Sequence, residues 1–122
     1  MGRGRMSDLD KIWDQCAAHL RPALAFARDL HRVEDVRQAV EASEAQLWPL
    51  KEHGSIVTEM RDFPTGVRVL DFWLAGGSLG ALVAAEPEIA KWGREHGCDA
   101  ARIIGRLGWA KALPHYERGG VV

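Results

Sequence analysis

Apolar residues recur every three or four positions in the first part of the chain, which is the spacing of one helical face. The positions on this face are Leu9, Ile12, Trp13, Cys16, Leu20 and Leu24. The pattern predicts a first helix capped by Ser7 and a second helix over residues 33–42. Because proline lacks a backbone N–H, Pro22 is predicted to kink or end the first helix, and Pro87 to kink or delay a later one.

The pattern then changes to the alternation that is typical of strands. Residues 45–50, 55–61 and 67–74 are the predicted strands, and Pro49 indicates that the first lies at an edge or bulge. The third strand is the most apolar, so we expect it in the middle of the sheet. Short turns join all three, which predicts an antiparallel meander of about three strands.

A glycine-rich stretch, residues 75–80, follows the third strand and is predicted to be a loop. A helical pattern then continues to about Glu95, and residues 100–104 form a short strand candidate. A strand–helix–strand order requires a crossover connection, so this last strand is predicted to run parallel to strand 67–74. Residues 105–113 complete the pattern as a short helix, and the predicted fold class is α+β.

Composition limits the classes of partner. The chain has 122 residues, enough for one domain over residues 8–122 behind a flexible arm of residues 1–7. Its net charge of −1 gives no electrostatic reason to expect nucleic acid or an anionic membrane as partner. No long apolar run or leader pattern occurs, and Cys16 and Cys98 stand alone without metal-ligand spacing. A cytoplasmic protein without a metal is therefore predicted.

Four short motifs carry a family resemblance. They are Leu47-Trp48, Phe72-Trp73-Leu74-Ala75-Gly76-Gly77, Ile89-Ala90-Lys91-Trp92 with Gly97-Cys98, and Gly105-Arg106-Leu107-Gly108-Trp109. With the order of elements, they resemble the GNAT family of acyl-CoA N-acyltransferases, and within it a small branch encoded by tailed phages. The resemblance covers about residues 8–118 and implies a GNAT-like α/β fold. The first and last strands of the family are not expected here, so the fold would be trimmed at both ends.

The resemblance also implies a cofactor, acetyl-CoA or another acyl-CoA, bound in the opening between strands 67–74 and 100–104. Its pyrophosphate would lie on backbone N–H groups before and at the start of the next helix. The implied binding residues are Leu74, Ala75, Gly76, Gly77, Ser78, Leu79 and Gly80. The family signature is Arg/Gln-x-x-Gly-x-Gly/Ala. With Gly80 in its last slot, Ala75 stands where Arg or Gln is expected and Ser78 where Gly is expected.

Acyl transfer to an amine needs a base for the amine and often an acid for the leaving thiolate. Glu59 and Asp71 lie on neighbouring predicted strands and are candidates for the base, acting through water. Tyr116 is the sole Tyr and the candidate acid. The alternatives are solvated carboxylates, an Asp71 paired with Arg61 or Arg68, and a Tyr116 that packs against the sheet.

Three functions therefore stay open at this stage. The first is acyl-CoA-dependent N-acyl transfer. The second is a non-catalytic phage or prophage protein, in the virion or in assembly, that acts through protein contacts. The third is a binding module whose open sheet edge pairs with a second copy of the chain. The five Trp residues fall one per predicted element and are predicted to be core residues: Trp13, Trp48, Trp73, Trp92 and Trp109.

Overall fold

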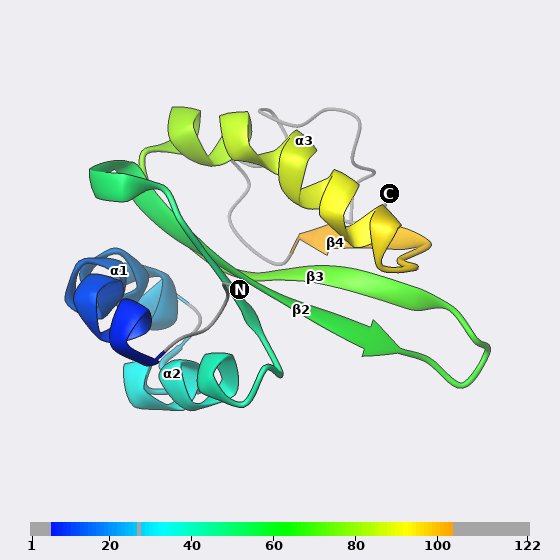
Figure 1. Cartoon of the computed structure of the whole chain (residues 1–122), viewed down its shortest axis with the longest axis horizontal. Coiled ribbons are helices and arrows are strands. Elements are labelled where there is room, and N and C mark those ends of the chain that lie inside the picture. Colours follow the sequence, from blue (N-terminus) through cyan, green and yellow to red (C-terminus); the bar gives the residue numbers. More distant parts are fainter. Residues whose placement is uncertain (1–5, 27, 104–122) are drawn as a thin grey trace.

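The computed structural model describes residues 6–26 and 28–103, which form a mixed α+β fold with three helices and a four-stranded sheet (Figure 1). In chain order the elements are α1 (Met6–Phe26), α2 (Val33–Glu41), β1 (Gln46–Pro49), the 3-10 turn η1 (Lys51–His53), β2 (Gly54–Asp62), β3 (Arg68–Gly77), α3 (Leu79–Glu95) and β4 (Ala100–Ile103). The predicted helix over residues 105–113, Trp109 and Tyr116 lie outside the described residues.

The sheet has the order β1-β2-β3-β4. The first three strands pair antiparallel, and β4 pairs parallel with β3, so the predicted meander and the predicted parallel strand are confirmed. Leu50 donates its N–H to the carbonyl oxygen of Gly54 at 2.9 Å, which makes every second residue of β1 a hydrogen-bonded position. Pro49 falls between those positions on the edge strand, where its missing N–H costs no ladder bond.

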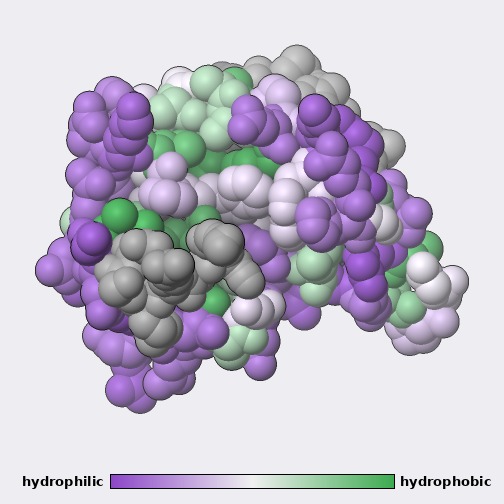
Figure 2. Space-filling model, in the orientation of Figure 1, coloured by the Kyte–Doolittle hydropathy of each residue, from purple (hydrophilic) through white to green (hydrophobic). Residues whose placement is uncertain are grey.

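Each face of the sheet carries its own core. The helices α1 and α2 cover one face and α3 covers the other (Figure 1). The α1–α2 core contains Leu9, Trp13, Ala17, Leu20, Leu24, Val33, Val36, Ala45, Val57 and Leu74. The α3 core contains Ile56, Leu70, Phe72, Leu82 and Ile89, with Trp48 and Trp92 packed against it. In the same orientation, Figure 2 shows apolar side chains gathered beside α3 and hydrophilic ones around them.

Two helix boundaries differ from the sequence prediction. The first helix begins at Met6, so Ser7 lies inside α1 and is not its cap. It also continues past Pro22 to Phe26, and α3 begins at Leu79, well ahead of Pro87. Both prolines lie on exposed helix positions. Water can therefore satisfy the backbone carbonyl that each proline leaves without an N–H partner.

The predicted loop over residues 75–80 is the main correction. The strand β3 runs on to Gly77, because Ser55 and Gly54 of β2 pair with Gly76 and Gly77. The helix α3 then starts at Leu79, which leaves Ser78 alone as the connection. The glycine-rich stretch is therefore the end of a strand and the first turn of a helix.

Candidate functional site

The junction between β3 and α3 is the place where the resemblance puts the cofactor. Ser78 caps α3, and its hydroxyl oxygen accepts the N–H of Ala81 at 3.4 Å. The N–H of Ser78 itself donates to the carbonyl oxygen of His53 at 2.8 Å. The N–H groups of Leu79 and Gly80 belong to the first turn, where a helix offers them no backbone acceptor. These two N–H groups therefore lie at the start of α3, which is exposed to solvent.

The two glycines at the end of β3 are needed for close packing. A Cβ at Gly76 would lie 1.8 Å from the carbonyl oxygen of His19 on α1. A Cβ at Gly77 would lie 2.3 Å from the carbonyl oxygen of His53, and Gly77 also has a φ of +118°. Both neighbours are backbone atoms that cannot move aside as a side chain would. Packing against α1 and η1 therefore explains Gly76 and Gly77 without a phosphate ligand.

The other predicted cofactor residues on β3 face the cores. Leu74 is buried in the α1–α2 core, and Ala75 packs against the α3 core. The register of the β2–β3 pair shifts just before Leu74. Thr58 of β2 pairs with Phe72, whereas its neighbour Val57 pairs with Leu74. Trp73 is the extra residue of this bulge and packs on the α1–α2 core beside Leu74. The bulge thus places two successive side chains on one face.

The ring of Trp73, on β3, contacts the connection between α1 and α2. The ring of His31 meets the Trp73 ring edge-on, with centroids 5.1 Å apart. Before His31, Arg28 and Asp29 have φ values of +63° and +52°, which non-glycine residues seldom adopt. The connection therefore holds His31 against the sheet at the cost of two strained residues.

Glu59 and Asp71 are brought together as direct cross-strand partners on β2 and β3. The Asp71 side chain is 1% exposed, and both of its oxygens are engaged. Its Oδ1 accepts Nε of Arg102 at 2.8 Å, and its Oδ2 accepts Nε of Arg61 at 2.7 Å and Nη2 of Arg102 at 2.8 Å. Glu59 accepts Nη2 of Arg61 through Oε1 at 3.2 Å. We call these four residues the Asp71 cluster.

The geometry of the Asp71 cluster separates the two candidate bases. Both carboxylate oxygens of Asp71 already accept hydrogen bonds from guanidinium groups, and these bonds raise the pKa of the Arg102 guanidinium. Glu59 is the more accessible carboxylate, with a side chain 23% exposed. Glu59 as base and Tyr116 as acid stay predictions, and Tyr116 lies outside the described residues.

The predicted pairing of Asp71 with Arg61 is confirmed, whereas the alternative pairing with Arg68 is wrong. Arg68 instead donates to Asp62 at 2.6 Å and to the carbonyl oxygen of His96 at 2.8 Å. The sequence did not predict Arg102 as a partner of Asp71. The signal for it is the register of the parallel pair, which sets Arg102 beside Asp71.

A polar contact that the sequence did not reveal joins α1 to β2 near the glycine junction. His19 Nε2 lies 3.2 Å from the carbonyl oxygen of Glu52 and must donate to it, so in the neutral ring Nδ1 accepts from Ser55 Oγ at 3.1 Å. Ser55 is 1% exposed. Burial raises the pKa of the neighbouring Cys16 thiol, and its contact with Ser55 opposes that shift. The arrangement fixes η1 on α1 and leaves no access to the Ser55 hydroxyl.

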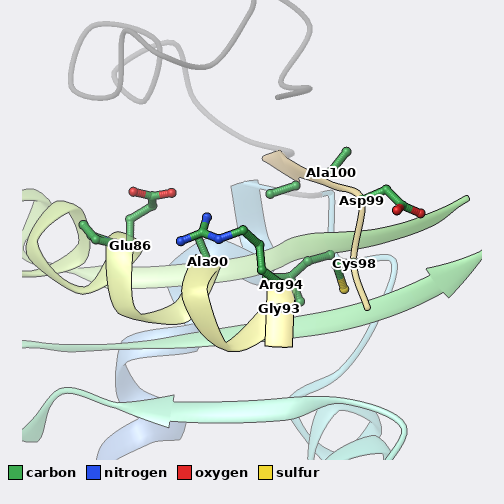
Figure 3. Close-up of a pocket in the computed structure, with 10 residues that line it drawn as sticks. Glu86, Ala90, Gly93, Arg94, Cys98, Asp99 and Ala100 are labelled. Atoms are coloured by element: carbon green, nitrogen blue, oxygen red, sulfur yellow. The ribbon is translucent and has the colours of Figure 1, made fainter. Parts of the chain in front are cut away.

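A pocket of about 490 Å³ lies at the other end of α3, between that helix and β4. We call it the α3–β4 pocket. Leu70, Ala90, Gly93 and Ala101 are among its apolar lining residues. Glu86, Arg94, Cys98 and Asp99 add polar groups, and Figure 3 shows the Glu86 and Arg94 side chains directed toward each other along α3. None of the predicted cofactor residues lines it.

Comparison with protein-family models, with curated proteins and with solved structures finds no match for this chain. Within residues 6–26 and 28–103, no helix has the length and apolar character that a bilayer crossing requires. In the same part of the chain, no three His, Cys, Asp or Glu side chains gather as a metal site would need. Function must therefore be argued from the geometry of β3 and its neighbours.

Proposed function

We propose that this protein binds an acyl-CoA along the end of β3 and the first turn of α3, as GNAT-like acyltransferases do. One observation carries the proposal. The pairing of β3 with β4 reaches Phe72 and Ile103, whereas β3 continues from Trp73 to Gly77 and leads directly into α3. In the described part of the chain, no strand pairs with this side of residues 73–77.

A strand edge of this kind suits the central arm of coenzyme A. That arm is linear and contains amide groups, which can pair with backbone N–H and C=O groups as an added strand would. The bulge at Trp73 bends β3 directly after Phe72, the last residue of β3 with a described partner on β4. The acyl end of such a ligand would then lie nearest to Trp73 and the Asp71 cluster.

The phosphates would lie at the start of α3. The N–H groups of Leu79 and Gly80 and the positive end of the helix dipole favour an anion there. The neighbouring N–H groups of Ser78 and Ala81 are already used by His53 and by the Ser78 side chain. With two amides and no Arg or Gln at Ala75, we expect weaker binding than the full signature gives.

Gly80 allows a sharp test, because a Cβ there would meet only Ser78 Oγ, at 3.8 Å. Titration calorimetry with acetyl-CoA and CoA is expected to show binding by the wild type and by Gly80→Ala. Gly80→Asp should remove it, since the new carboxylate repels phosphate while still suiting a helix N-terminus. The absence of any binding heat from the wild type at millimolar ligand would refute the proposal, and so would equal binding by both variants.

A second candidate function, a non-catalytic role through protein contacts in a phage particle or its assembly, is favoured by the Asp71 cluster. Two arginines already bind the buried carboxylate of Asp71, one of the two candidate bases, which leaves Glu59 as the remaining carboxylate candidate. This function predicts acyl-CoA binding without acyl transfer to a panel of amines, measured by mass spectrometry of the amines. Transfer that Glu59→Gln abolishes would exclude it and would identify Glu59 as the base.

A further inference from the structure

The connection between α1 and α2 presents an imidazole at the bulge of β3. The His31 ring meets the half-buried Trp73 ring edge-on, with the centroids 5.1 Å apart, while His31 itself is exposed to solvent. In the part of the chain that the structure describes, no hydrogen bond reaches either nitrogen of this ring. An exposed imidazole without such a bond can exchange a proton with a molecule that lies beside Trp73.

Hydrogen bonds fix the chain on both sides of His31. At the end of α1, the N–H of Asp29 donates to the carbonyl oxygen of Leu24 at 2.9 Å. At the start of α2, the N–H of Arg32 donates to Oδ2 of Asp35 at 2.8 Å. Since His31 lies between these two anchors, the fold of the α1–α2 connection sets the place of its ring beside β3.

His31 reaches the same face of the sheet as the Asp71 cluster. Leu70 and Phe72 point into the α3 core, so the Asp71 side chain between them points to the side that α1 and α2 cover (Figure 1). Trp73 packs on that side too, two strand positions further along, which corresponds to about 7 Å between Cα atoms. The acyl end of the proposed ligand lies at this same point of β3.

We propose that His31 is the general base for acyl transfer to the α-amine of a peptide, a role that rests on the proposed binding of acyl-CoA. The competing carboxylates of Asp71 and Glu59 both accept hydrogen bonds from guanidinium groups, whereas the His31 ring accepts none from the described residues. Imidazole is also the side chain that most often transfers protons near neutral pH.

The reaction is balanced without a further reactant. The amine nitrogen attacks the thioester carbonyl carbon, so that a C–N bond forms and the C–S bond breaks, with its electron pair leaving on sulfur. His31 takes one proton from the attacking nitrogen, and the protonated imidazole returns it through solvent to the thiolate. The products are an amide and free CoA, and the imidazole is neutral again.

The α-amine of a peptide suits an imidazole base better than a lysine side chain does. The ordinary pKa of an α-amine is about 8, against about 10.4 for a lysine ε-amine, so the α-amine gives up a proton to a weak base more readily. Leu30 precedes His31 and is 78% exposed, which adds an apolar side chain at the neighbouring position. The acceptor that fits best is therefore a peptide whose first residue is apolar.

The experiment measures binding and transfer separately on the full chain. Titration calorimetry follows acetyl-CoA binding, and mass spectrometry follows acetylation of the tripeptide Leu-Gly-Gly, with Nα-acetyl-lysine as the ε-amine comparison. His31→Gln should bind acetyl-CoA as the wild type does but acetylate the tripeptide roughly 100-fold more slowly, the usual contribution of a general base. Added imidazole should restore part of the rate to His31→Ala, because free imidazole can accept the proton in the vacated space.

His96→Gln is the matched control. His96 is also exposed, and its ring stacks on Trp92 with centroids 4.0 Å apart, but Trp92 packs on the α3 core at the other face of the sheet. This variant should acetylate the tripeptide at the wild-type rate. A wild-type rate for His31→Gln would overturn the proposal, and so would loss of acetyl-CoA binding in that variant, which would show a structural role.

Calorimetry separates the role of His31 from the binding on which it rests. Acetyl-CoA binding by the wild type without acetylation of the tripeptide overturns His31 as the base and leaves the proposed binding in place. Faster acetylation of Nα-acetyl-lysine than of the tripeptide overturns the assignment of the acceptor. The absence of acetyl-CoA binding by the wild type refutes the proposed function itself, and the role of His31 falls with it.

Discussion

The two halves of β3 are stabilised by different kinds of contact. From Val69 to Phe72 the strand has a partner on each side, β2 and β4, and its side chains carry the contacts: Leu70 and Phe72 in the α3 core and Asp71 between two arginines. From Trp73 to Ala75 the side chains still pack on the two cores, but at Gly76 and Gly77 the backbone itself approaches α1 and η1. One strand thus combines a half that is held by its side chains with an end where the lack of side chains allows close packing.

The bulge at Trp73 is where the two halves meet. Strict alternation would turn Leu74 toward α3, but the extra residue turns both Trp73 and Leu74 toward α1 and α2. Gly76 then reaches the α1 side as well, where only a missing side chain allows α1 to approach. The proposed acyl-CoA site lies along the second half because its far edge lacks a strand partner in the described residues.

The largest expected effect comes from filling the glycine half. Gly76→Ala places a methyl carbon 1.8 Å from the backbone of α1, so α1 or β3 must move. We expect a loss of about 3 kcal/mol or more in the free energy of unfolding, measured by urea denaturation. Gly80→Ala is the matched control and should be neutral or stabilise by about 0.5 kcal/mol, because the site is open and helical. A tolerated Gly76→Ala would show that the contact with α1 does not constrain β3.

The next effect tests the side-chain half. Asp71→Asn keeps the shape of the side chain but removes the charge that both arginines bind, and an amide N–H₂ would then face a guanidinium. We expect a loss of about 2 kcal/mol, below the cost for a fully buried pair because Arg61 and Arg102 are partly exposed.

Asp62→Asn is the control for that substitution, since it removes an Arg68 ion pair on the surface and should lower the urea midpoint much less. Equal midpoints for both variants would mean that the buried carboxylate of Asp71 contributes no more than a surface one.

The sequence predicted the side-chain half better than the glycine half. Alternation located β2 and β3, and the strand–helix–strand order gave the parallel pairing of β4, which in turn sets Arg102 beside Asp71. Glycines carry no hydropathy signal, so a strand that ends in Gly76-Gly77 resembles a loop in the sequence. Their role depends on the approach of His19 and His53, which are 57 and 24 positions away from Gly76 and Gly77 respectively.

The proline predictions failed for a related reason. A proline in the sequence indicates a missing N–H, but whether the helix continues depends on the side of the helix that it occupies. Pro22 and Pro87 are both exposed, so solvent can compensate. That information belongs to the tertiary structure. The same holds for the cofactor segment, where the motif indicated phosphate binding and the packing explains two of its glycines.

A smaller effect tests how η1 is held beside the glycine half. Ser55→Ala removes the hydroxyl that donates to His19 Nδ1 and leaves the packing of β2 otherwise intact. We expect a loss of about 1 kcal/mol in urea denaturation, the usual contribution of one neutral hydrogen bond. Thr65→Ala, on the exposed turn between β2 and β3, is the control and should have no effect. An unchanged stability of Ser55→Ala would leave the approach of Gly76 to α1 as the main constraint there.

The smallest effect lies where β3 begins, on the solvent side of the side-chain half. The hydrogen bond from Arg68 holds the pKa of the Asp62 carboxyl below its ordinary value. The folded-state pKa is the lower one, so the contact contributes its full stability above the unfolded-state pKa, which is about 4. That contribution is lost as the pH falls through the folded-state pKa.

NMR titration of the Asp62 carboxyl carbon should therefore give a lower midpoint in the folded chain than in the urea-unfolded chain. The same midpoint in both states would mean that the Arg68 pair does not form in solution. The hydrogen bond from the Arg68 guanidinium to the carbonyl oxygen of His96 would then be that side chain's remaining tie to the end of α3. The ionic stabilisation of β3 would in that case come from the Asp71 cluster, where burial protects the pairs from screening.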